Sequence, residues 1–130
     1  MGDVQLTQIG QIAVVVDDLE RATAFYRDTL GMRFQFQVPR MSFFDVGGVR
    51  LMLGLPEGSE KAATSTIYYR VDDLAQAFEQ LSGRGVEFVE APHLVARMED
   101  HDLWMAFFHD TEGNLLALMS ELPRDGGGPA

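Results

Sequence analysis

The sequence of 130 residues contains no cysteine. It therefore forms no disulfide framework and offers neither a thiolate metal site nor a cysteine nucleophile. Apolar runs long enough to cross a membrane are also missing, and the opening residues, MGDVQLTQIG, lack the basic start and the apolar stretch of a secretory signal. We therefore expect a cytoplasmic protein.

Basic residues are scarce as well. Lysine and arginine together number 10 against 20 acidic residues, Lys61 is the single lysine, and the formal net charge is −10. Such a charge repels phosphate backbones and anionic lipid headgroups. Nucleic acid and membrane surfaces are therefore not expected partners.

Apolar residues make up 46% of the chain, which is enough for a folded core in a chain of one-domain size. The last stretch, PRDGGGPA, is rich in turn-forming residues and resembles a frayed terminus. We expect one domain over residues 1–122, followed by a flexible tail over 123–130.

The first half of the chain has a clear pattern of elements. Residues 9–16 are apolar and β-branched, Asp17 and Asp18 stand where a helix begins, and apolar residues then recur at helical spacing until Gly31. Three strand-like segments follow at 33–38, 42–46 and 49–55, the last two joined by Gly47-Gly48 as in a hairpin. The order is therefore β-α-β-β-β, and residues 55–65 have the composition of a linker.

The same pattern returns after that linker. VDDL at 16–19 recurs at 71–74, GMRF at 31–34 is echoed by GVEF at 85–88, and FFDVGGVRLML at 43–53 is echoed by FFHDTEGNLLALM at 107–119. The later offset is larger, which indicates an insertion in the longer hairpin around APHLVARMEDHDLW. Three echoes in the same order predict two tandem βαβββ modules, at about 8–55 and 65–122.

These three motifs resemble the vicinal oxygen chelate superfamily, which includes glyoxalase I, extradiol dioxygenases, fosfomycin-modifying enzymes and bleomycin-resistance proteins. The resemblance covers about residues 8–122. It implies an α+β fold in which two tandem βαβββ modules form an open, cup-like mixed sheet around a ligand cavity. It also implies a homodimer and, in many members, a divalent metal ion.

The resemblance also implies where a metal would bind. Each module of the metal-dependent relatives supplies one ligand from its first strand and one from the strand after the glycine turn. Those positions hold Gln11, Met52, Thr66 and Ala117 in this chain. One amide, one thioether, one hydroxyl and one methyl group do not match the carboxylate and imidazole sets that divalent cations prefer. We therefore expect no metal site and no cofactor.

The three histidines, His93, His101 and His109, are spaced by eight residues. Along a single extended strand, neighbours at this spacing would lie about 26 Å apart, too far to share one ion. A hairpin turn near Glu99-Asp100 would bring His93 and His101 closer together. His101, beside several carboxylates, is a candidate general base and also a candidate exposed hairpin residue.

Strand alternation predicts the lining of a cavity that is apolar with a few polar anchors. Trp104, with Phe43 and Phe44, is a candidate stacking surface for a flat ligand. The expected ligand-binding residues are Gln11, Met52, Thr66, Tyr68, Trp104, Ala117 and Met119.

Two functions follow. The first is a metal-free protein of the bleomycin-resistance type that encloses a hydrophobic or aromatic small molecule, with a cationic ligand favoured by the acidic charge. The alternative is a glyoxalase-like lyase or isomerase, or a dioxygenase, acting on a small oxygenated substrate. The candidate catalytic residues for that alternative are Tyr68, Arg50 and His101. Fold alone does not separate the two functions.

Overall fold

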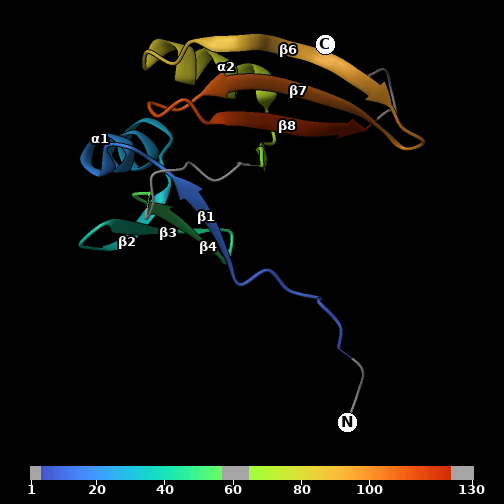
Figure 1. Ribbon diagram of the computed structural model, residues 1–130. Coiled ribbons are helices and arrows are strands. Elements are labelled where there is room, and N and C mark those ends of the chain that lie inside the picture. The colour runs from blue at the N-terminus through green and yellow to red at the C-terminus, as the bar shows by residue number, and fades with distance from the viewer. Residues whose placement is uncertain (1–3, 57–64, 124–130) are drawn as a thin grey trace. The chain divides into compact units, whose positions relative to one another are not determined.

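The computed structural model describes residues 4–56 and 65–123. The chain divides into two compact units, residues 1–64 and 65–130 (Figure 1). The predicted linker at 55–65 lies mostly outside the described residues, and so does all of the predicted tail except Pro123. The grouping of the two modules into one domain stays a prediction.

Unit 1 contains one four-stranded mixed sheet. The strands run in the order β1-β4-β3-β2, with β1 parallel to β4 and the other pairs antiparallel. The helical segment packs against β3 and β4. Its elements are β1 (Gln11–Val15), α1 (Leu19–Ala24), the π-helical η1 (Phe25–Thr29), β2 (Arg33–Val38), β3 (Met41–Val46) and β4 (Val49–Gly54).

Unit 2 repeats this topology. Its strands run in the order β5-β8-β7-β6, with β5 parallel to β8, and α2 packs against β6, β7 and β8 (Figure 1). Its elements are β5 (Ile67–Arg70), α2 (Leu74–Gly83), β6 (Phe88–Arg97), β7 (His101–His109) and β8 (Leu115–Pro123). The predicted α+β architecture of tandem βαβββ modules is therefore confirmed.

The repeated motifs have the same structural roles in both units. Asp18 and Asp73 are N-caps, and their carboxylates accept hydrogen bonds from the backbone N–H groups of Arg21 and Gln76, both at 3.0 Å. The glycines of the second and third motifs adopt positive φ, with values of 74° at Gly31 and 94° at Gly85. Side chains other than glycine rarely adopt this conformation, which explains why glycine ends both helices.

One face of each sheet is covered by its helix and forms the core. The side chains there are large and apolar, and each that is fully removed from water contributes about 1.5–3 kcal/mol to folding. The buried set includes Val16, Tyr26, Phe44, Leu51 and Leu53 in unit 1 and Leu74, Leu81, Phe108, Leu116 and Leu118 in unit 2. The opposite face of each sheet, which we call the helix-free face, carries the residues of functional interest.

The structure changes one predicted boundary and confirms another. The helix predicted from Asp18 to Gly31 is α-helical only as far as Ala24 and continues as the π-helical η1. The predicted turn near Glu99-Asp100 is confirmed, because β6 ends at Arg97 and β7 begins at His101. None of the helices in the described residues has the length and hydropathy of a membrane span.

Candidate ligand-binding faces

The helix-free face of unit 1 is defined by strand alternation and register. Gln11 pairs with Arg50, and Met52 pairs with Ala13 on one side and with Phe43 on the other. Side chains directly opposite one another in neighbouring strands share a face. Leu51 and Leu53, which alternate with Arg50 and Met52, are buried on the other face. The structure therefore brings together Gln11, Arg50 and Met52, three of the predicted site residues.

Aromatic and polar contacts organise this face. Phe36 stacks on Phe43 with ring centroids 4.6 Å apart, and the Arg50 guanidinium lies 5.8 Å from the Phe43 ring. Gln11 Nε2 donates a weak hydrogen bond to Met52 Sδ at 3.7 Å. Phe36 remains 45% exposed, so one of the two rings in this aromatic pair keeps open surface in unit 1.

The helix-free face of unit 2 carries a row of aromatic side chains. Tyr68 on β5, Ala117 on β8 and Phe107 on β7 are successive register partners across the sheet. The Tyr68 and Phe107 rings meet edge to face at 5.9 Å, and the His93 ring lies nearly parallel to Phe107 at 6.3 Å. Ala117 is fully buried, whereas Tyr68 is 46% exposed. Ala117 therefore supports the two rings and offers no surface of its own.

Two further predicted residues of unit 2 differ in position. Met119 pairs with Met105 and Arg70, so it lies on the helix-free face beside the aromatic row. Thr66 immediately precedes β5 and is partly exposed. By alternation, Thr66 falls on the same face as Tyr68.

Trp104 lies on the other face of the sheet. Its register partners are Ser120 and Leu94, and alternation separates it from Met105 and Phe107. Phe44, which was grouped with Trp104 as a stacking surface, is fully buried under the helix of unit 1. The structure therefore does not bring either ring to a helix-free face. Phe36 and Phe107 take their place in the two aromatic pairs.

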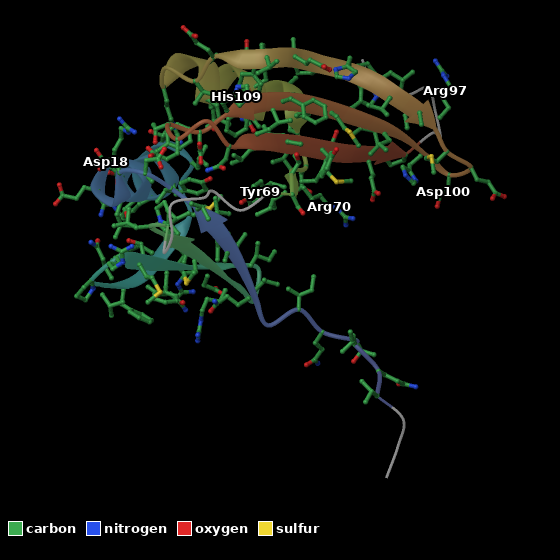
Figure 2. All side chains as sticks on the ribbon, viewed as in Figure 1. Asp18, Tyr69, Arg70, Arg97, Asp100 and His109 are labelled. Carbon is green, nitrogen blue, oxygen red and sulfur yellow. The ribbon has the colours of Figure 1, made fainter. Side chains whose placement is uncertain are left out.

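The histidines have separate partners. His101 Nδ1 lies 2.6 Å from Asp100 Oδ1, and His101 Nε2 lies 3.7 Å from Glu121 Oε2. This contact lowers the pKa of the Asp100 carboxyl, chiefly through the hydrogen bond from the imidazole. Glu121 also pairs with Arg70 at 3.4 Å, and both Asp100 and Arg70 are labelled in Figure 2. His109 is exposed at the end of β7.

The side chains at the expected metal positions supply few of the donor groups that divalent cations prefer. Gln11 and Met52 contact each other, but one amide and one thioether do not suit a hard or borderline divalent cation. Thr66 and the buried Ala117 add at most one hydroxyl. Among residues 4–56 and 65–123, no three His, Cys, Asp or Glu side chains are grouped closely enough to hold an ion.

The comparison with known families agrees with the fold of the two units. The sequence profile described as the Glyoxalase/Bleomycin resistance protein/Dioxygenase superfamily matches residues 8–118. The chain belongs to this superfamily. The match spans both units and includes the three repeated motifs except for Met119.

Proteins that are similar to this chain in sequence or fold are named after several different activities. A glyoxylase-like domain-containing protein of Didymella fabae is 32% identical, with 85% of this chain and 91% of that protein aligned. A mitochondrial methylmalonyl-CoA epimerase of Mus musculus is 35% identical over a shorter region, 46% of this chain and 37% of the epimerase. A lactoylglutathione lyase structure from Agrobacterium tumefaciens matches the fold at a TM-score of 0.75 and 21% identity, covering 89% of this chain and 95% of the lyase.

Proposed function

We propose that this protein binds a flat hydrophobic or aromatic small molecule on its helix-free faces, without a metal, in the manner of the bleomycin-resistance members of the superfamily. The observation that carries the proposal is the pair of aromatic contacts, Phe36 with Phe43 and Tyr68 with Phe107. Aromatic side chains supply large apolar area and prefer offset or edge-to-face contact with another ring. Each pair includes a ring about half exposed in this structure, Phe36 or Tyr68.

The chemistry at the expected metal positions supports the metal-free part of the proposal. The test is elemental analysis of the purified protein before and after soaking in nickel, zinc, iron and manganese followed by desalting. We expect metal well below stoichiometric amounts throughout. A stoichiometric amount of any of them would contradict the proposal and return the histidines and Asp100 to consideration as ligands.

The binding part is tested by a thermal-shift screen of aromatic compounds. A ligand at 100 times its Kd stabilises the folded state by about 2.7 kcal/mol, which raises the melting temperature by several degrees. Phe36→Ala and Phe107→Ala should reduce that shift, while Val95→Ala, an exposed apolar control on β6, should leave it unchanged. Equal loss of the shift in all three variants would contradict binding at the aromatic pairs.

A second candidate function is catalysis by a glyoxalase-like lyase or isomerase. It is favoured by the contact of His101 with Asp100 and Glu121, which places an imidazole beside two carboxylates. The names of the epimerase and the lyase among the relatives point to the same class. Turnover of a thioester substrate that disappears in His101→Gln would establish this function over simple binding.

We also propose that two copies associate through the N-terminal segment, residues 4–10. This segment forms no helix or strand in the structure and runs away from the unit 1 sheet (Figure 1). Val4 is 89% exposed, Leu6 is 96% exposed and Ile9 is 65% exposed. Residues 4–16 contain no charged side chain, although the whole chain carries −10. Two acidic copies can therefore meet at this segment with less charge repulsion than elsewhere.

The association is tested by sedimentation velocity on the wild type and two variants. We expect a dimer for the wild type, a monomer for Leu6→Glu and a dimer for Gln5→Glu, because the second variant adds the same charge without removing apolar surface. Since Leu6 is almost fully exposed, its substitution leaves the core intact. A monomeric wild type, or a dimeric Leu6→Glu, would contradict the proposal.

A further inference from the structure

The outer strand of unit 2 places a histidine and a carboxylate beside the aromatic row. Register pairs Glu90 with Phe107 and His93 with Met105, so both side chains lie on the helix-free face. Glu90 Oε2 lies 3.4 Å from His93 Nε2. Regular strand alternation does not predict either residue as a ligand contact, because the register of β6 shifts between Phe88 and Glu90 and again between Glu90 and His93.

The hydrogen bond of His93 determines what its ring can offer. His93 Nδ1 lies 2.8 Å from the Ala91 carbonyl oxygen, which can only accept, so Nδ1 carries the proton of the bond. In the neutral imidazole, Nε2 is then an acceptor. The Glu90 carboxylate is also an acceptor, so in that state two acceptors lie 3.4 Å apart on the helix-free face, with the His93 ring nearly parallel to Phe107.

Two converging acceptors select a donor with positive charge. A primary ammonium group carries three N–H donors and can bond to both, whereas a hydroxyl carries one donor and a carboxylate carries none. The net charge of −10 attracts cations over a longer range and repels anions. Next to this pair, Phe107 and Tyr68 offer rings for an aromatic group, with Met105 in the following register position.

We propose that the helix-free face of unit 2 binds an aromatic ammonium compound, with its rings against Phe107 and Tyr68 and its N–H donors bonded to Glu90 and His93. This inference rests on the proposed binding function and names the chemical class of its ligand. Glu90 provides the charge, and His93 is held by Ala91 and Phe107 in the orientation that presents Nε2.

The experiment uses three probes with one ring system: naphthylmethylamine, naphthylmethanol and naphthoate. They differ in carrying a cation, a neutral hydroxyl or an anion next to the same rings. Affinities for the full chain are measured by isothermal titration calorimetry. We expect the amine to bind about tenfold more tightly than the alcohol, because a hydrogen bond to a charged group adds more than a neutral one. The naphthoate should bind most weakly.

The variants separate the local contact from general charge. Glu90→Gln should remove the preference for the amine and leave the alcohol affinity unchanged, and His93→Gln should reduce the preference by a smaller factor. Glu79→Gln on the exposed side of α2 makes the same change in net charge and should keep the preference. Phe107→Ala should weaken both the amine and the alcohol.

The possible results distinguish failure of the ammonium contact from failure of aromatic binding altogether. If the amine and the alcohol bind equally, or if Glu79→Gln abolishes the preference as fully as Glu90→Gln, the ammonium contact is overturned while aromatic binding stands. If the naphthoate binds best, the acceptor pair is not the recognition element. If no probe binds and no aromatic compound produces a thermal shift, the proposed binding function fails along with the inference.

Discussion

The turns that follow the third strand of each unit show how one fold accommodates two local solutions. In unit 1 the β3–β4 turn contains Gly47-Gly48, and Asp45 accepts one hydrogen bond, from Gly48 N–H at 3.2 Å. In unit 2 the β7–β8 turn spans residues 110–114, and Asp110 accepts from the backbone N–H groups of Glu112 and Asn114 at 2.8 Å and from Asn114 Nδ2 at 3.0 Å. Both turns contain glycine at positive φ, Gly47 and Gly48 in the tighter turn and Gly113 in the longer one, and the longer turn adds a buried carboxylate that accepts three hydrogen bonds.

The helix-free faces of the two units also differ, in the side chains that they carry. Unit 1 combines an aromatic pair with the arginine cation of Arg50, while unit 2 has His93 with Glu90 beside its aromatic row and His101 with Glu121 farther along the sheet. The buried faces, by contrast, are closely alike. The repeat therefore shares its core and its helix caps, while the exposed side of each sheet has its own chemistry.

The largest effects should come from the equivalent core phenylalanines. Phe44 and Phe108 are almost completely buried, and replacing either with alanine should cost about 3–5 kcal/mol through lost burial and a residual cavity. Urea denaturation followed by far-ultraviolet circular dichroism measures the loss in both variants. Fluorescence of Trp104, the one tryptophan of the chain, reports on unit 2. A loss below about 2 kcal/mol in one variant alone would show that the two cores are not equivalent.

The next effect separates the two turns. Asp110→Ala leaves two backbone N–H groups and one side-chain amide without their acceptor in a buried turn, so we expect a loss of about 2–4 kcal/mol. Asp45→Ala removes one longer hydrogen bond at a partly exposed position and should cost less than about 1 kcal/mol. The same denaturation experiment compares them. Equal losses would mean that the Gly47-Gly48 turn depends on its aspartate as much as the longer turn does.

The helix N-caps should show no difference between the units. Asp18→Ala and Asp73→Ala each remove a side-chain acceptor from the first turn of a helix, and each should cost about 1 kcal/mol. Asparagine at either position should restore most of the stability, because its side-chain oxygen also accepts from the helix backbone. A markedly larger loss at one cap would show that its carboxylate does more than cap the helix.

These cases explain what the sequence could and could not predict. VDDL and the glycine motifs act through local rules, a cap or a positive φ, so their roles follow from spacing alone. The face of the sheet on which each aromatic residue lies depends on strand register. In unit 2 that register is determined by the β7–β8 turn and by the shifts in β6. Trp104 was therefore expected among the ligand contacts and lies with Ser120 on the helix side. The contact of His101 with Glu121 joins residues on two strands and has no local signal.

The last effect, confined to high pH, distinguishes a partly buried tyrosine of unit 2 from its counterpart in unit 1. Tyr69 on β5 occupies the repeat position of Val14 on β1, 55 residues earlier, and is labelled in Figure 2. Burial, together with the negative charge of Asp110, raises the pKa of Tyr69 from 10.0 to about 12. In the described part of the chain, its buried hydroxyl has no hydrogen-bond partner.

A pKa that is higher in the folded state means that the unfolded chain ionises first as the pH rises. The contribution of neutral Tyr69 to stability is therefore complete below pH 10.0 and is lost as the pH rises towards about 12. Absorbance titration of the phenols should show one transition near the upper value that is absent in Tyr69→Phe. Asp110→Asn should lower that pKa, since it removes the neighbouring charge. A transition that stays in place in Asp110→Asn would leave the burial of the hydroxyl as the sole cause of the raised pKa.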